Sequence, residues 1–195
     1  MNRNKLFASG IAIILLLGFI LTTLPLRAAD DVTPQQKKAE IRKMANDTLE
    51  RLYKNQPSAK KTINNASGYA VFSNFGMKIF LAGGGSGKGI AVNNKSKQET
   101  FMKMVELQAG FGWGVKKFRL VWVFENQSGL DSFVNSGWEF GGQATASAQA
   151  SGQGGAFAGA MSISPGIWLY QLTDDGLALE LTAKGTKYYK DGKLN

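Results

Sequence analysis

Hydrophobic and polar positions follow two different periodicities along this chain. Between residues 33 and 54 apolar side chains recur at spacings of three and four, which predicts a helix with one apolar stripe. Thr33, Pro34 and Gln36 match an N-cap, a first-turn proline and a capping box. A shorter helix is predicted over residues 57–66. The stripe of the first helix consists of Ile41, Met44, Ala45, Thr48, Leu49 and Leu52.

After Gly68 the pattern predicts strands instead of helices. Short apolar runs occur at residues 69–72 and 77–81, and strict alternation over 105–115 predicts one long strand. Residues 120–124 are continuously apolar, as expected of a strand that is buried on both faces.

The second half of the chain continues in this way. One or two helical turns are predicted over residues 130–134. Residues 138–151 alternate between small apolar and polar side chains, which favours a strand with a small-residue face, although a flexible Gly/Ala/Ser/Gln linker has the same composition. Further strands are predicted at 156–162 and, as a hairpin around an Asp-Asp-Gly turn, at 167–172 and 177–181.

Helices first and about seven to nine closely spaced strands afterwards indicate an α+β fold. We expect N-terminal helices over residues 33–66, followed over residues 69–195 by a curled, mainly antiparallel sheet that forms a barrel or half-barrel.

The first 29 residues have the features of an export signal. Arg3 and Lys5 precede an apolar run over residues 6–26, and small residues follow at Ala28 and Ala29. About 20 apolar residues also suffice to cross a bilayer as a helix, so the segment is either cleaved or retained as an N-terminal anchor. We therefore expect an exported protein, periplasmic or associated with the cell envelope, whose residues 30–195 form a single domain.

Charge narrows the choice of partner. Residues 30–195 contain 20 Lys and Arg against 14 Asp and Glu, a net charge of +6. Such a balance suits an anionic partner such as phospholipid headgroups, although the same excess also serves solubility. Nucleic acid is not expected, because of the export signal and because no basic–aromatic stacking motif stands out.

The chain contains no histidine and no cysteine. This excludes histidine-based nucleophile systems, thiolate zinc sites and histidine metal sites. Carboxylates are scattered singly apart from Asp174 and Asp175, which fall in a predicted turn where aspartates bond to the local backbone. We expect no enzymatic activity, cofactor or metal; catalysis by carboxylate, serine or lysine alone is the remaining enzymatic alternative.

A glycine-rich cluster at residues 83–89 surrounds Lys88. A phosphate-binding loop requires glycine five positions before the Gly-Lys pair and a helix after it. Here Ala82 occupies that position and the following residues, 90–92, favour a strand. We predict a tight bend between Phe80 and Ile90, with cradling of a headgroup phosphate by its backbone amides as the alternative.

Several of these segments, in this order, resemble the SYLF domain family, which is also described as lipid-binding and, in fungi, as actin-regulating. The similarity covers residues 45–195. Ser73 departs from it, since the family usually has proline there, and the segment at 93–104 is unusual. The motifs that carry the resemblance lie at residues 49–57, 66–72, 83–89, 108–114, 129–133, 142–150, 176–181 and 188–191.

The resemblance implies binding of membrane lipid, chiefly anionic phospholipids or phosphoinositides, through basic residues of the N-terminal helical region. Bacterial relatives are typically exported envelope proteins, which agrees with the leader, and the actin role is not expected here. Carried onto this chain, the candidate lipid-binding residues are Lys37, Lys38, Arg42, Lys43, Lys60 and Lys61.

The basic helix over residues 33–54 has two interpretations. Either its apolar stripe packs on the sheet and its lysines are solvated, or the helix meets a membrane through its basic side or lies in the interface with its apolar face buried. Each basic residue near an anionic surface contributes at most about 1 kcal/mol, so several must act together. The expected function is a non-enzymatic lipid-binding module that recognises anionic phospholipid headgroups. The alternative is a structural or protein-interaction module of the envelope, with a protein partner and no lipid specificity.

Overall fold

The computed structural model describes residues 32–79, 82–109, 114–136, 139–140, 156–178 and 186–195. The predictions for the leader, for nearly all of the alternating segment at 138–151 and for residues 179–181 lie outside these residues. Within them, none of the helices combines the length and the hydropathy needed to span a bilayer. The division of the chain into leader and single domain stays a prediction.

The first helix begins where its capping box predicts, and the third begins three residues before the predicted turns at 130–134. Helix α1 (Pro34–Asn55) starts at a capping box in which the Gln36 N–H donates to the Thr33 hydroxyl (3.2 Å) and the Thr33 N–H donates to the Gln36 side chain (2.7 Å). Helix α2 (Ser58–Asn65) follows directly. Helix α3 (Gln127–Asn135) starts at Asn126, whose side chain accepts the Gly129 N–H at 2.8 Å. All three predicted helices are confirmed.

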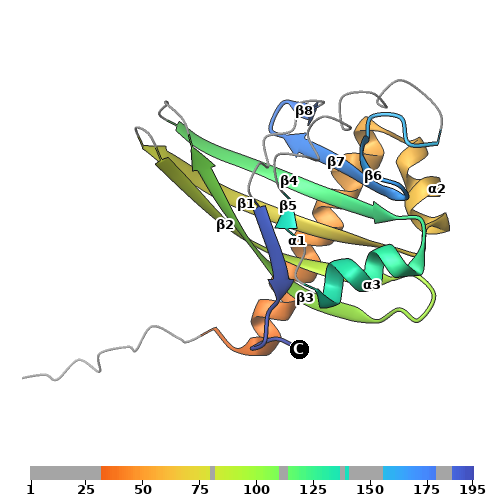
Figure 1. The fold of residues 1–195 in the computed structure, drawn as a ribbon, viewed down its shortest axis with the longest axis horizontal. Coiled ribbons are helices and arrows are strands. Elements are labelled where there is room, and N and C mark those ends of the chain that lie inside the picture. The colour runs from red at the N-terminus through yellow and green to blue at the C-terminus, as the bar shows by residue number, and fades with distance from the viewer. Residues whose placement is uncertain (1–31, 80–81, 110–113, 137–138, 141–155, 179–185) are drawn as a thin grey trace, which may run out of the picture. The chain divides into compact units, whose positions relative to one another are not determined.

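The described strands form one sheet in which every pair is antiparallel. The order is β5-β9-β3-β2-β1-β4-β7-β6, and β8 also pairs with β7. In the described part of the chain the two end strands do not pair with each other, so the curled sheet is a half-barrel (Figure 1). The predicted α+β fold is confirmed. The strands are β1 (Gly68–Ile79), β2 (Ala82–Asn93), β3 (Glu99–Ala109), β4 (Gly114–Phe124), β5 (Glu139–Phe140), β6 (Met161–Ser164), β7 (Ile167–Thr173), β8 (Gly176–Ala178) and β9 (Thr186–Lys190).

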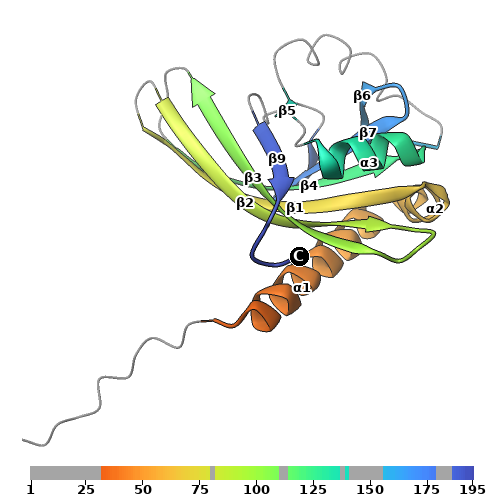
Figure 2. The same ribbon diagram turned by 60° about the horizontal axis from the view of Figure 1, so that its bottom comes forward.

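Helices cover the central strands on both faces. Figure 2 shows α1 and α3 on opposite sides of the sheet. Val71 and Val121 belong to the core that contains the apolar stripe of α1, whereas Phe72 and Trp122 belong to the core under α3. Phe133 of α3 lies in this second core, with its ring centroid 5.6 Å from that of Trp122. The prediction that residues 120–124 are buried on both faces is confirmed, because all of them are fully buried.

Strand boundaries differ from the prediction in three places. The apolar run at 69–72 and the described part of the run at 77–81, residues 77–79, belong to one strand, β1. The alternating segment at 105–115 is not one strand, because β3 ends at Ala109 and β4 begins at Gly114. Period-two alternation continues through the connection, so the pattern alone does not reveal the chain reversal. Residues 156–159 form a turn, and the following strand, β6, begins only at Met161.

The predicted bend at residues 83–89 is wrong. These glycines lie within β2, paired with β1 on one side and β3 on the other, so their backbone amides belong to the sheet and do not form a phosphate cradle. A Cβ atom added at Gly87 would lie 2.5 Å from the carbonyl oxygen of Ser73 and 2.6 Å from Cγ of Met104. Here glycine permits close packing of neighbouring strands, which is its second use besides turns.

Candidate functional site

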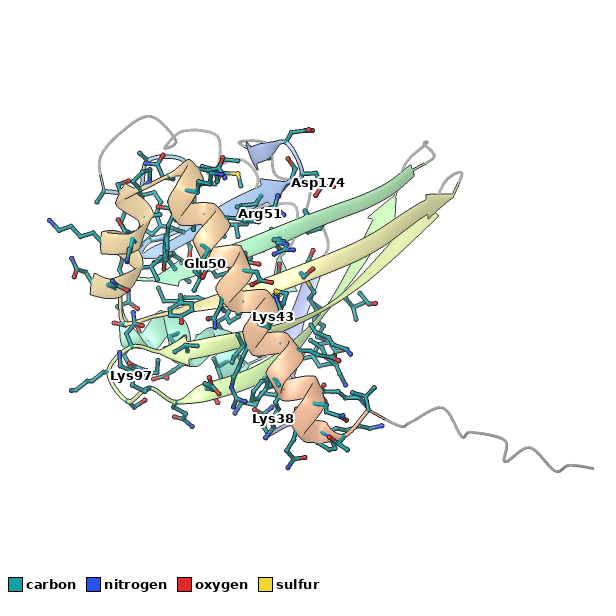
Figure 3. The ribbon with its side chains drawn as sticks, turned by 180° about the vertical axis from the view of Figure 1, so that it is seen from behind. Lys38, Lys43, Glu50, Arg51, Lys97 and Asp174 are labelled. Carbon is teal, nitrogen blue, oxygen red and sulfur yellow. The ribbon has the colours of Figure 1, made fainter. Side chains whose placement is uncertain are left out.

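Helix α1 carries four of the six predicted lipid-binding residues. Figure 3 shows the helix crossing one face of the sheet diagonally, with Lys38 near its N-terminus and Lys43 further along. Its stripe is buried against the sheet, and Leu52 is fully inaccessible. The structure therefore confirms that the apolar stripe packs on the sheet, so this face is not available for burial in a membrane interface. Contact of the basic side with a membrane stays a prediction.

Arg42 serves mainly to attach α1 to the sheet. Its Nε lies 2.9 Å and its Nη2 2.7 Å from Oε2 of Glu99 in β3, a two-pronged salt bridge. These hydrogen bonds raise the pKa of Arg42 above its ordinary value. The guanidinium also lies over the ring of Phe101, 5.2 Å from its centroid, and Lys38 Nζ lies over the same ring at the same distance. The charge of Arg42 is thus largely satisfied within the protein.

Two other candidate cations of α1, Lys37 and Lys43, are held less firmly by described partners than Arg42 is. Lys43 Nζ contacts Asp47 at 2.8 Å, but 77% of the Lys43 side chain is exposed, so this helical pair is weak and screened by salt. Lys37 makes no salt bridge with any described residue. Glu40 and Glu50 are exposed on the same helix, so its solvent side is mixed in charge and not uniformly basic.

The structure does not bring all six predicted residues together. Lys60 and Lys61 are exposed on α2, beyond the C-terminal end of α1. Because α1 has 22 residues, it is about 33 Å long, and Figure 2 shows α2 at the opposite end from the start of α1. The candidates therefore form two groups, one on the first turns of α1 and one on α2.

A hollow of about 430 Å³ lies beside the α2 group. Its wall includes Lys61, Glu125 and Phe157. The Phe157 ring stacks on Trp168 with centroids 4.2 Å apart, and Trp168 Nε1 donates to Glu125 Oε2 at 3.0 Å. The one carboxylate of the hollow is thus engaged by an indole, and no second carboxylate lines the described wall. The geometry does not provide a carboxylate pair for acid–base chemistry.

A third group of cations comes from the strands and has no counterpart in the sequence-based prediction. Lys88 of β2 lies directly opposite Lys103 of β3 on one side and Ser73 of β1 on the other, and Ser73 lies opposite Arg119 of β4. These residues share the face of the sheet that carries α1, where Arg119 Nη1 donates to the Thr48 hydroxyl at 3.1 Å. They are far apart in sequence, so only strand register makes them neighbours.

Asp191 compensates part of this charge. Lys103 Nζ lies 3.0 Å from Asp191 Oδ1, and only 6% of the Asp191 side chain is exposed. Burial acts to raise the pKa of Asp191. Hydrogen bonds from Lys103 and the Lys193 N–H, together with the positive charges of Lys103 and Lys88, outweigh burial and hold that pKa below its ordinary value. Asp191 therefore stays ionised and fixes the ammonium group of Lys103.

Metal ligands do not gather in the described part of the chain, where no three acidic side chains come close enough to share an ion.

Comparison with known proteins identifies a relative. The chain is similar to Beta cell expansion factor A from Aeromonas veronii, with 34% identity over 168 residues. The match covers 83% of this chain and 60% of the relative, so the chain spans well under the full length of that protein. No protein-family model matches the chain. The relative's name describes an effect on beta cells and names no ligand.

Proposed function

We propose that this chain is a SYLF-like, non-enzymatic module of an exported protein and that it docks on anionic phospholipid headgroups. The observation that carries the proposal is the arrangement on the two N-terminal helices. Their apolar residues are used for the core, while Lys43, Lys60 and Lys61 are exposed and Lys37 and Lys38 are partly exposed. Surface docking by charge is the form of membrane contact that this arrangement favours.

The expected affinity is modest and depends on salt. Each lysine near an anionic bilayer contributes at most about 1 kcal/mol, so five such residues acting together give useful binding only at low ionic strength. At about 0.1 M salt the screening length is only about 10 Å. The lysines of α1 and α2 therefore have to lie within about 10 Å of the membrane surface to be attracted to it. A retained leader would hold them at that distance.

The alternative is a protein-interaction module of the envelope without lipid specificity. The partly apolar hollow beside Lys61 supports it, because a mixed apolar and charged recess also suits a protein side chain. The name of the relative is compatible with either function, since an effect on cells follows from binding to lipid or to protein.

Co-sedimentation with vesicles tests the proposal. We expect the purified full chain to bind vesicles that contain phosphatidylglycerol, to release them at about 0.5 M salt, and to ignore neutral phosphatidylcholine vesicles. The double variant Lys37→Gln/Lys43→Gln should weaken binding by up to about thirtyfold, because two contributions of about 1 kcal/mol are lost. Arg42 is left intact, since its change would loosen α1 from the sheet.

The matched control is Lys95→Gln/Lys97→Gln, which removes the same charge from exposed positions in the turn between β2 and β3. It should leave binding within about threefold of the unchanged chain. Absence of binding to anionic vesicles at low salt would overturn the proposal. Capture of one stoichiometric protein by a chain that ignores vesicles would support the alternative.

A further inference from the structure

A second hollow, of about 370 Å³, lies on the α1-bearing face of the sheet, over β1, β2, β3 and β9. None of the described residues that line it is acidic. Hydroxyl and ammonium groups dominate its polar lining, which is supplied by Ser73, Ser86, Lys88, Lys103 and Tyr189. Such a set consists of hydrogen-bond donors and positive charge, with the hydroxyls able to donate.

Strand register places two lysines of the lining opposite each other. Lys88 and Lys103 are direct cross-strand partners, and such partners have Cβ atoms about 5 Å apart. Like charges in this position destabilise a sheet. Among the described residues Asp191 forms a salt bridge to Lys103 and none to Lys88, and its single negative charge leaves the two lysines with a net charge of +1. An anion in the hollow would remove this repulsion.

The same register places hydroxyl-bearing residues beside the two lysines. Ser73 is the partner of Lys88 on β1, and Tyr189 is the partner of Lys103 on β9. Ser86 is two residues before Lys88 and therefore on the same face of β2. A phosphate monoester carries a charge of about −1.5 to −2 at neutral pH and three acceptor oxygens. Lys88, Lys103 and Asp191 together carry a net charge of +1, which attracts such a group, and two ammonium groups and three hydroxyls can donate to its oxygens.

We propose that this hollow binds a phosphate monoester group. Lys88 supplies the free charge, Ser73, Ser86 and Tyr189 donate hydrogen bonds, and Asp191 positions Lys103 beside Lys88. The phosphate belongs to a lipid headgroup such as that of phosphatidic acid or to a soluble ester. Binding of a lipid headgroup at this site rests on the proposed function, whereas binding of a soluble phosphate ester does not.

The variant Lys88→Gln tests the site with the full chain. It removes an exposed charge for which the structure gives no salt bridge, so the fold should remain intact, and an unchanged melting curve verifies this. The probes are glycerol 3-phosphate in solution and vesicles of phosphatidic acid or phosphatidylglycerol. We expect the unchanged chain to bind glycerol 3-phosphate and to prefer phosphatidic acid, and Lys88→Gln to weaken both by about tenfold or more.

Lys95→Gln is the matched control, because it removes the same charge from the turn that follows β2. It should bind both probes as the unchanged chain does. A second variant, Ser86→Ala, should weaken glycerol 3-phosphate binding severalfold without any change in net charge.

The outcomes separate this inference from the proposed function. Equal losses in Lys88→Gln and Lys95→Gln would overturn the site, since net charge alone would then explain binding. A second outcome is vesicle binding that shows no preference for phosphatidic acid and is unchanged in Lys88→Gln. This outcome would support lipid docking and refute the site. Binding of glycerol 3-phosphate without any vesicle binding would support the site and refute lipid docking.

Discussion

Asp191 connects a lysine of the sheet to the C-terminal residues of the chain. It is nearly buried, accepts the Lys103 ammonium at 3.0 Å, and also accepts the backbone N–H of Lys193 at 3.0 Å. The backbone N–H of Asp191 donates to Phe101 O at 2.9 Å, which ties the C-terminal residues to β3. Asp191 therefore contributes to stability and to the position of Lys103 at the same time.

The lowered pKa of Asp191 predicts how stability depends on pH. Because the carboxylate binds its proton less readily in the folded chain than at its ordinary pKa of 3.8, its contribution is complete above that value. The contribution is lost as the pH falls through the lower, folded-state pKa. Asp191→Asn should reduce the free energy of unfolding by about 1–3 kcal/mol near neutral pH. The difference from the unchanged chain should shrink at about pH 3.

Urea unfolding at both pH values measures this prediction. Glu99 offers a comparison, since its salt bridge to Arg42 is more exposed and Glu99→Gln should cost less at neutral pH. A loss in Asp191→Asn that is the same at both pH values would show that the carboxylate charge does not contribute.

At the scale of the element, β2 is the strand that departs most from ordinary composition. Its glycines leave room for side chains of both neighbouring strands, Phe72 in β1 and Met104 in β3. The paired backbone makes the strand stable despite its low intrinsic preference for extended structure, because tertiary packing outweighs local propensity. The strand also places Lys88 between Ser73 and Lys103, so its close packing and the proposed phosphate site have one origin.

Gly89→Ala tests this close packing. The added Cβ would meet the carbonyl oxygen of Val71 and the ring of Phe72, both buried, so the strand would have to move. We expect the free energy of unfolding to fall by about 1–3 kcal/mol in urea titrations. Gly192→Ala is the control, because nothing lies within 4 Å of its Cβ position, and it should change stability by less than about 0.5 kcal/mol. Equal effects of the two substitutions would contradict the packing argument.

At the scale of the whole molecule, the half-barrel is a sheet held between two helical layers. Residues 70–72 of β1 and 120–124 of β4 are buried on both faces, whereas α1 contacts the sheet along one stripe and carries exposed lysines. The proposed docking therefore requires no unfolding. The exposed lysines can contact anionic headgroups while the apolar stripe of α1 stays packed on the sheet.

Hydrogen exchange distinguishes docking from insertion. In solution we expect the slowest amide exchange at residues 70–72 and 120–124, since exposing them requires opening both cores. Addition of anionic vesicles should leave exchange in α1 unchanged or slower. Faster exchange along α1 on vesicles would mean that the helix leaves the sheet and buries its apolar face in the interface, against the docking mechanism.

Local patterns determined much of this fold. Three features were predictable because each depends on residues close in sequence. They are the capping box of α1, the Asp-Asp-Gly hairpin between β7 and β8, and the doubly buried run at 120–124. The candidate lysines of α1 and α2 were predictable as exposed cations for the same reason. The role of Arg42 was not predictable, because its salt-bridge partner, Glu99, is 57 residues away in the sequence.

By itself the sequence determined the helices, the presence of a largely antiparallel sheet and the excess of positive charge. Only the tertiary structure decided that the glycines of residues 83–89 form a strand, that the segment at 105–115 divides between two strands, and that Lys88, Lys103 and Ser73 are neighbours. The physical reason is that alternation fixes which face a side chain occupies within its strand, whereas register between strands depends on contacts distant in sequence. The grouping of Ser73, Lys88 and Lys103 is therefore a product of register.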